Sequence, residues 1–256
     1  MSEGLSVSVL KSIFRFPFRG PGWQGRFLMG SVFILASFLI PVLPLLFVAG
    51  YGLAITRRAI RGETLDLPAW QDWGRLAMDG LRGGVVSLVY LLPGTLVMGG
   101  GMVVYFAAVF GLAATESFAG RYGGPEPMLI FLAMAIMFLA TAVGLLLQLL
   151  GAIPLPVAMV HFVRRDRVAA AFYVREWWPL LWANALGWLV TWVVIAGLWV
   201  VVYLGLMVAY YTICLCCLVP FLSAPLLFYV WLVAAALLGQ TYRESAAIAA
   251  GAEVTS

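Results

Sequence analysis

Four long stretches of the chain contain no charged residue, and they indicate what class of protein this is. They are residues 27–56, 83–115, 127–163 and 179–242. Each is longer than the roughly 20 residues that an α-helix needs to cross the hydrocarbon core of a bilayer. A buried helix of a soluble protein needs no such length. We therefore predict an all-α fold, a polytopic transmembrane helical bundle forming one membrane domain over residues 1–256.

Composition agrees with the pattern. The chain is 64% hydrophobic and only 10% charged, whereas soluble proteins are roughly a quarter charged. The formal net charge of +4 comes from arginines beside the apolar stretches. Such arginines indicate contact with anionic lipid headgroups rather than with nucleic acid. We expect no cleavable signal peptide, because the first apolar stretch is too long for a signal core.

The first uncharged stretch, 27–56, poses a topological puzzle. As one helix its 30 residues would run about 45 Å, against a hydrocarbon core of about 30 Å. Pro41 and Pro44 interrupt it midway, and basic residues flank it on both sides. The positive-inside rule pulls both flanks to the cytoplasm. A single kinked span satisfies the length and a re-entrant hairpin satisfies the charge. The charge pattern favours the hairpin.

The other stretches predict two pairs of spans. Stretches 83–115 and 127–163 form one pair, because the loop between them is poor in positive charge, as an exterior loop should be. We expect Pro93 and the glycines after it to kink or break the first of these helices, and Pro154 and Pro156 to do so near the end of the second. The 64 residues of 179–242 suit two crossings with a turn near 205–212, and Pro220 and Pro225 should kink the last helix.

Between the spans lie segments rich in arginine and aromatic residues, which the membrane–water interface selects. We predict interfacial segments at 1–26, with an amphipathic helix over 5–16, at 57–82 and at 164–178. In the second, Asp66 would cap a short surface helix. The tail, 243–256, should fray. All of these segments and both termini are expected on the cytoplasmic side of the inner membrane.

A weak internal repeat accompanies this pattern. Three times a pair of prolines precedes an arginine cluster that begins at Arg57, Arg164 or Arg243. The spacings differ, so a structural repeat is one hypothesis and independent helix kinks are the other.

Three sequence runs resemble a known family. They are FRFPFRGPGWQGRFLMG, TRRAIRGETLDLPAWQDWGRLAMDGLRGGVVSLVYLLP and PFLSAPLLFYVWLVAAALLGQTYRESA. They are similar to an uncharacterised family of prokaryotic multi-pass membrane proteins, domain of unknown function four-thousand-thirteen. The resemblance implies a membrane fold and no activity. The matching residues are Pro17, Phe18, Trp23, Arg57, Arg58, Arg61, Gly62, Leu67, Pro68, Trp70, Asp72, Trp73, Asp79 and Gly80.

Few residues are candidates for chemistry. His161 is the only histidine, and its arginine neighbours indicate an interface residue rather than a base. The spacing of Cys214, Cys216 and Cys217 fits no common metal site, and apolar packing explains them more simply. The carboxylates of segment 57–82 are better explained by capping and arginine pairing than as a site. We therefore expect no cofactor, no metal and no enzyme activity.

The leading functional hypothesis is a non-catalytic subunit or scaffold of a membrane assembly. No charged residue lies within the apolar stretches, although ion-coupled transporters normally keep an ionisable one near mid-bilayer. The arginine–tryptophan segments would instead contact anionic lipid headgroups, a membrane-protein partner or a second copy of the chain. The candidate interface residues are Arg57, Arg58, Arg61, Trp70, Asp72, Trp73, Arg164, Arg165, Trp177 and Trp178.

Two alternatives remain open. A transporter or channel for a neutral or lipid-like solute would use a pathway of helices broken by proline and glycine. Its candidate residues are Pro93, Gly94, Gly99, Gly100, Gly101 and Gln148. A lipid-handling enzyme would use the interfacial carboxylates Asp72 and Asp79.

Overall fold

The structure is a computed structural model of the whole chain and describes residues 7–119, 127–212 and 218–254. The secondary structure of these residues is entirely helical, which confirms the predicted all-α fold. The elements in order are α1 (Val7–Arg15), the 3-10 helix η1 (Phe16–Phe18), α2 (Trp23–Ala36), α3 (Leu43–Arg61), α4 (Trp73–Ala119), α5 (Pro127–Ala152), α6 (Leu155–Arg165), the 3-10 helix η2 (Val168–Phe172), α7 (Val174–Ala183), α8 (Ala185–Tyr211) and α9 (Val219–Val254).

Within the described residues, five helical segments are long and apolar enough to cross a membrane. Their positions match the four uncharged stretches, the last of which supplies two of them. The chain is therefore an integral membrane protein. The five segments are Leu43–Arg61, Trp73–Gly111, Met128–Arg165, Ala185–Tyr211 and Val219–Gly251.

The chain folds as two compact units, described separately below. Unit 1 comprises Met1–Val85 and Pro156–Ser256, and unit 2 comprises Val86–Leu155. The helix α4 begins in unit 1 and ends in unit 2.

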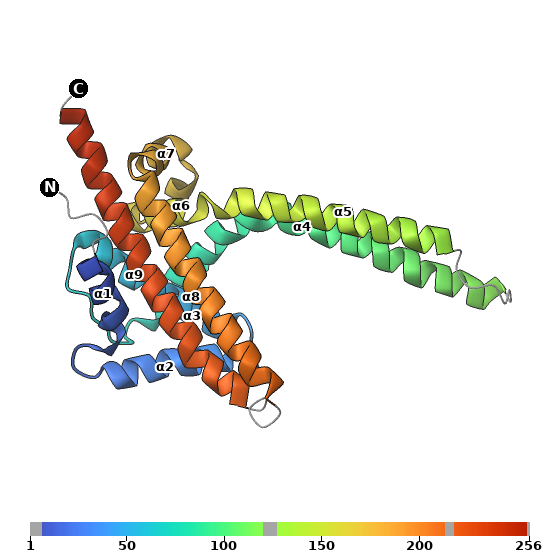
Figure 1. Cartoon of the computed structure of the whole chain (residues 1–256), viewed down its shortest axis with the longest axis horizontal. Helices are drawn as coiled ribbons and strands as arrows, with labels where there is room; N and C mark the ends of the chain where they lie inside the picture. Colours follow the sequence, from blue (N-terminus) through green and yellow to red (C-terminus); the bar gives the residue numbers. More distant parts are fainter. Residues whose placement is uncertain (1–6, 120–126, 213–217, 255–256) are drawn as a thin grey trace. The chain divides into compact units, whose positions relative to one another are not determined.

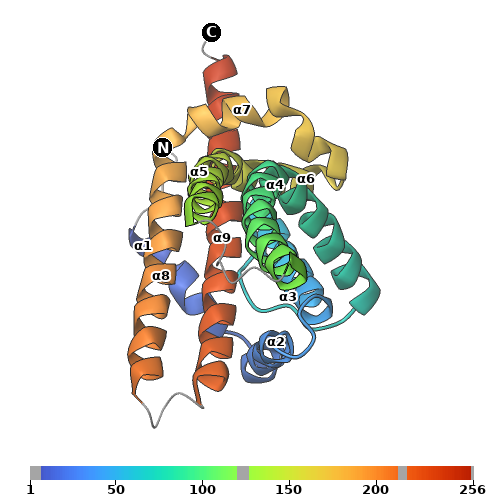
Figure 2. The same cartoon turned by 90° about the vertical axis from the view of Figure 1, so that its right-hand side faces the viewer.

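The central helix of unit 1 is α9, on which α2, α3 and α8 pack. Its residues Phe228, Leu232 and Leu237 are fully buried. The helices α8 and α9 lie side by side (Figure 2), joined near Thr191 and Thr241, whose hydroxyl oxygens are 2.6 Å apart. In Figure 1, α2 runs across the lower end of α9.

The helices α3 and α9 pack in parallel. The indole of Trp231 donates to the carbonyl oxygen of Val48 (3.0 Å), and the hydroxyl of Thr56 donates to the carbonyl oxygen of Ala235 (3.0 Å). Contact residues therefore advance in the same direction along both helices. As a result, the arginines that end α3 lie near Arg243 of α9.

The stretch 27–56 is not one continuous helix. It divides into α2 and α3, separated by a turn over 37–42 that contains Pro41. Pro44 lies in the first turn of α3, where a missing N–H costs little. With 14 residues, α2 is about 21 Å long and too short to cross the membrane core, whereas the 19 residues of α3 reach about 29 Å. The break falls at the prolines, as both predicted geometries require, and the choice between a kinked span and a re-entrant hairpin stays a prediction.

Residues 63–72, which we call the strap, contain no helix. The short surface helix capped by Asp66 is therefore a wrong prediction. The strap runs back along α3, because Arg58 binds Asp66 and the hydroxyl of Tyr51 donates to the carbonyl oxygen of Pro68 (2.8 Å). Leu67 between these anchors is fully buried. Burial of its side chain and main-chain bonding to α3 replace the capping and hydrogen bonds of a short helix.

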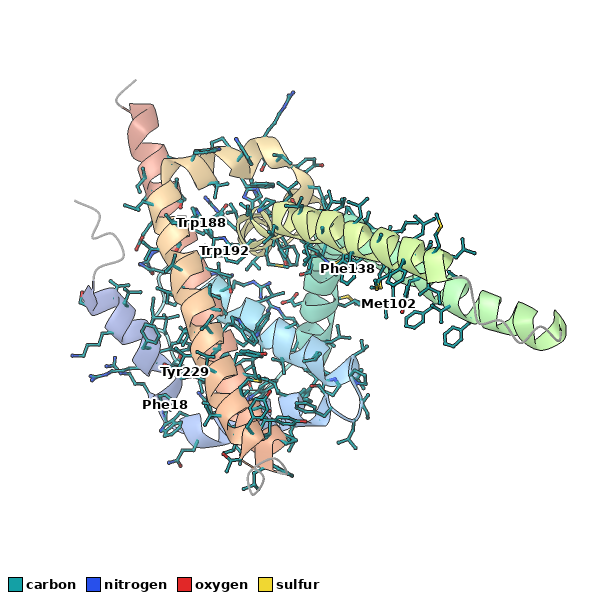
Figure 3. The ribbon with its side chains drawn as sticks, turned by 45° about the vertical axis from the view of Figure 1, so that its right-hand side comes forward. Phe18, Met102, Phe138, Trp188, Trp192 and Tyr229 are labelled. Atoms are coloured by element: carbon teal, nitrogen blue, oxygen red, sulfur yellow. The ribbon has the colours of Figure 1, made fainter. Side chains whose placement is uncertain are left out.

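Unit 2 is a hairpin of two helices, the later part of α4 and α5. The helices approach closely at small residues, since a Cβ on Gly94 would lie only 2.7 Å from the carbonyl oxygen of Gly144. Met102 and Phe138 lie on this hairpin (Figure 3), and both are more than half exposed. The two stretches thus pack as neighbouring helices, and their crossing of the membrane as a pair stays a prediction. Of the kink or break predicted at Pro93, the break does not occur, because α4 continues through this residue, whereas α5 ends just before Pro154.

Two predictions about the ends of the chain have clear outcomes. The N-terminal helix, expected over 5–16, is α1; Ile13 within it and Phe16 just after it are buried in the core of unit 1. Phe18 and Tyr229 stack with ring centroids 5.6 Å apart (Figure 3). The described part of the tail does not fray, since α9 continues from Arg243 to Val254 and Ser245 is fully buried.

Candidate functional site: an arginine-lined pocket in unit 1

The arginine clusters of unit 1 lie at one end of it, which we call the basic end. Arg57 at the end of α3 forms an ion pair with Asp166, directly after α6 (3.6 Å). Gly62 packs against the guanidinium of Arg243 on α9. The basic residues of four separate parts of the sequence are thus neighbours, because Arg19 and Arg243 line a common cavity of about 370 Å³.

A larger polar cavity of about 530 Å³ opens between α3, the strap and the first turns of α4. We call it the arginine pocket. Its volume lies within the range of ordinary ligand sites. Five arginines and four carboxylates line it, for a formal net charge of +1. These charged residues are Arg26, Arg57, Arg58, Arg61, Arg75, Glu63, Asp66, Asp72 and Asp79.

The α3 wall of the pocket follows from helical spacing. Tyr51, Ala54, Arg58 and Arg61 recur at intervals of three and four residues and therefore share one face. At 1.5 Å per residue, Tyr51 lies about 15 Å from Arg61 along the helix. The pocket thus extends from the basic end toward the middle of α3, a depth of about half a bilayer core.

Ion pairs line the pocket, and one of them is buried. Arg57 and Asp79 are 3.1 Å apart, and their side chains are only 13% and 6% exposed. Arg75 approaches the same carboxylate at 3.9 Å. Arg58 binds Asp66. Asp66 and Asp79 are therefore paired with arginines, and the buried carboxylate of Asp79 has the partner that a charge withdrawn from water needs.

Two charged residues of the pocket have no ion-pair partner among the described residues. Arg26, half-buried at the start of α2, donates instead to the carbonyl oxygen of Leu67. Asp72 is exposed and adopts a left-handed backbone conformation (φ 55°), which aspartate tolerates better than most residues. The pocket therefore has one cation within it that no carboxylate of the described residues neutralises.

An aromatic cluster forms the floor beside the strap. Trp70 stacks on Tyr51 with ring centroids 4.1 Å apart, and its indole N–H donates to the carbonyl oxygen of Arg26 (2.8 Å). Trp73 contacts Phe47 and Phe33 and is 41% exposed. Of the two predicted interface tryptophans, Trp70 therefore packs inside the fold and Trp73 remains partly accessible.

The second half of the predicted interface surrounds His161. Its Nδ1 lies 2.7 Å from the hydroxyl of Tyr242 and its Nε2 lies 3.0 Å from a carboxylate oxygen of Glu176, which also accepts from Arg165 (3.0 Å). The carboxylate accepts, so Nε2 carries the proton and Nδ1 accepts from the tyrosine. The hydrogen bond from His161 and the charge of Arg165 hold the pKa of Glu176 below its ordinary value.

His161 is only 3% exposed, so it is not the exposed interface residue that its neighbours suggested. Arg164 lies over the ring of Tyr242, 5.8 Å from its centroid. Trp177 is buried and donates to the carbonyl oxygen of Ala171 (2.9 Å), whereas Trp178 is 45% exposed. Of this group, Arg164, Arg165 and Trp178 are accessible at the surface of unit 1.

The predicted transport residues lie in the hairpin of unit 2, where several of them pack the two helices together. Gly101 faces Ala140, whereas a Cβ added to Gly99 or Gly100 would meet open space. The amide of Gln148 donates to the hydroxyl of Thr95 (2.9 Å), a helix–helix hydrogen bond. In the described part of the hairpin, these contacts supply packing and assemble no polar pathway.

Other candidate chemistry finds little support. Cys214, Cys216 and Cys217 lie outside the described residues. Among the residues that the structure does describe, no three histidine, cysteine, aspartate or glutamate side chains are grouped so that they could hold a metal ion.

Sequence reasoning missed Arg26, Tyr51 and Tyr242 as parts of these polar sites. Arg26 directly precedes an uncharged stretch, where an arginine is typical of the membrane interface. Tyr51 and Tyr242 lie inside uncharged stretches, where tyrosine resembles ordinary apolar packing. A single signal could have found Tyr51: it precedes Arg58 by seven residues, two helical turns, on the same face.

Comparisons with known proteins identify a family and no relative of known activity. A family model described as protein of unknown function (DUF4013) matches residues 33–211, more than half of the chain. The matched range includes α3, the strap and α6, but neither Arg26 nor Arg243. No curated protein and no solved structure matches the chain.

Proposed function

The chain belongs to the DUF4013 family, and on that premise we propose that it is a non-catalytic subunit or scaffold of a membrane assembly. It embeds in the membrane through its long apolar helices and contacts lipid headgroups or a protein partner at its basic end. The observation that carries the proposal is the meeting of arginine clusters from distant parts of the sequence at one end of unit 1.

The charges of the basic end are suited to binding at a surface. Arg61 and Arg165 are 62% and 58% exposed at the side chain, and Trp178 lies on the same α7 segment as the partner of Arg165. Exposed arginine beside tryptophan is typical both of membrane–water interfaces and of protein contact sites. The positive-inside rule orients the basic end toward the cytoplasm of an inner membrane.

The orientation has a direct test. Single cysteines at Gly62 and at Ala169 should react with a membrane-impermeant reagent from the same face of the membrane, the cytoplasmic one. Reaction of the two positions from opposite faces would exclude a common basic end.

The scaffold role is tested by purification in a gentle detergent. We expect a stoichiometric protein partner or a homo-oligomer, measured by light scattering and by mass spectrometry of the intact complex. Replacing Arg61 and Arg165 by glutamine should weaken that association. Arg15→Gln is the control for the loss of a single charge, because Arg15 is exposed on α1 and belongs to neither of the two replaced positions.

A strictly monomeric chain that also carries a solute across liposome membranes would reject the proposal. Such a result would favour a transporter, and its pathway would have to involve residues other than the packed glycines of the hairpin.

A further inference from the structure

Arg26 of the arginine pocket is a half-buried cation without a counter-charge among the described residues. Its guanidinium donates to the carbonyl oxygen of Leu67, and its own carbonyl oxygen is held by the indole of Trp70. The other four arginines of the pocket each pair with a carboxylate. Withdrawing a cation from water without an anion costs free energy, so the pocket as it stands is electrostatically incomplete.

The free-energy cost of this unpaired charge depends on where Arg26 lies. Trp70, which fixes the main chain of Arg26, stacks on Tyr51, and Tyr51 lies about 15 Å from Arg61 along α3. The guanidinium itself reaches the strap beside Asp66, the partner of Arg58, and therefore lies within the pocket. Counter-ions from bulk water screen a buried charge poorly, so a bound anion is the more effective neutraliser.

Charge and size define which anion fits. The pocket's five arginines exceed its four carboxylates by one, which a monoanion neutralises and a dianion would overcompensate. Guanidinium groups bind phosphate oxygens through two parallel N–H bonds. Arg26 has five N–H donors in its fork, of which the carbonyl of Leu67 takes one.

We propose that the arginine pocket binds a phosphodiester monoanion, with the Arg26 guanidinium as its main ligand. The two sources of such a group are the headgroup of a membrane phospholipid and a small soluble phosphodiester. A cavity of about 530 Å³ accommodates either. The inference rests on the proposed function, because it gives the basic end a defined ligand within the membrane surface that it contacts.

The test is native mass spectrometry of the delipidated full-length protein in a neutral detergent. The protein is titrated with phosphatidylglycerol, with phosphatidylcholine and with glycerophosphoglycerol, which is the soluble headgroup without acyl chains. We expect one phosphatidylglycerol per chain, bound more tightly than phosphatidylcholine, whose headgroup adds a positive charge. Binding of phosphatidylglycerol alone assigns the site to a lipid, and equal binding of glycerophosphoglycerol assigns it to the phosphodiester group itself.

Two variants test the site independently of each other. Arg26→Gln should weaken the adduct by about tenfold, the effect of one charge-assisted hydrogen bond, and Arg26→Lys should restore part of it. Ala54→Phe fills the cavity without changing its charge and should weaken binding similarly. The control is Arg167→Gln, which removes the same charge from an exposed position outside the pocket.

Wild-type affinity in both Arg26→Gln and Ala54→Phe would overturn the proposal, as would an equal loss in Arg167→Gln, which would indicate diffuse attraction to the basic end. These outcomes are separate from those of the scaffold role. A failed titration with intact partner capture rejects only the headgroup site, whereas a monomeric protein that still binds one lipid rejects only the scaffold.

Discussion

Replacing Gly80 by alanine tests how closely α3 and α4 approach. A Cβ at this position would overlap the carbonyl oxygen of Leu46 and would lie 2.8 Å from the carbonyl carbon of Leu46 and 3.0 Å from the amide nitrogen of Gly50. Both neighbours are backbone atoms of α3, so no side chain can rotate away. Gly84, one turn later on the same helix, has nothing within 4 Å of the equivalent position and provides a matched control.

The magnitude follows from these distances. Carbon atoms in contact prefer a separation of about 3.5 to 4.0 Å, so the distance to the carbonyl carbon alone requires the helices to move apart by at least about 0.7 Å, and the overlap with the carbonyl oxygen requires more. Overpacking of this kind costs about 3 kcal/mol at the upper end of its usual range. Alanine in place of glycine stabilises the helix by about 1 kcal/mol at either position, because alanine has the higher helix propensity. We therefore expect Gly80→Ala to lower the free energy of unfolding by about 2 kcal/mol and Gly84→Ala to raise it by about 1 kcal/mol.

The difference between the two variants is the quantity to measure, because the propensity contribution cancels in it. About 3 kcal/mol corresponds to a gap of about 6 to 12 °C in unfolding midpoint for a protein of this size. Thermal unfolding of both variants in one detergent, followed by tryptophan fluorescence, would detect it. Equal midpoints for Gly80→Ala and Gly84→Ala would show that α3 and α4 do not cross at this glycine.

Three further predictions concern polar and aromatic contacts of unit 1, each measured by thermal unfolding. Asp79→Asn should destabilise by about 3 kcal/mol, because it leaves the buried guanidinium of Arg57 without its nearest partner. Trp70→Ala should cost about 3 to 5 kcal/mol through the lost aromatic packing beside the strap. Glu176→Gln should lower the midpoint at neutral pH. Since the hydrogen bond from His161 lowers the pKa of Glu176, the wild type should lose this advantage only as the pH falls below about 4.5.

Each of these three predictions would be contradicted by a specific result. A neutral Asp79→Asn would mean that the paired charges are solvated, and a neutral Trp70→Ala would mean that the strap does not pack on α3. A gap between wild type and Glu176→Gln that stays constant between neutral pH and pH 3 would remove the carboxylate from the polar cluster.

Much of the fold could be predicted because the bilayer limits the choices. Uncharged runs longer than about 20 residues have few stable structures besides helices, and the five apolar helices follow from them. The positions of the prolines also indicated where helices begin. Pro44 and Pro156 each lie in the first turn of a helix, α3 and α6, the position where proline is best tolerated. This local preference explains the recurrent proline–arginine pattern without a structural repeat.

The packing of the strap on α3 could not be predicted from the sequence. A charged segment usually lies at the surface, but in a helical bundle it can also pack against other helices. Its charges could face headgroups or the protein interior, and both environments neutralise them. The choice depended on contacts between residues far apart in sequence, such as Trp70 with the main chain of Arg26 and Arg57 with Asp79. Periodicity within one segment contains no information about such partners.

The same reasoning explains why the arginine pocket became visible only in three dimensions. In the sequence, segment 57–82 has five arginines against four carboxylates, which suggests a set of mutually neutralised surface pairs. Folding leaves Arg82 out of the pocket and brings in Arg26 from α2. The formal balance is unchanged at +1, yet the unpaired cation now lies in a cavity rather than in water. A charge that is trivial at a surface thereby becomes the feature that most strongly defines a ligand, because its cost is removed only by an anion that fits beside it.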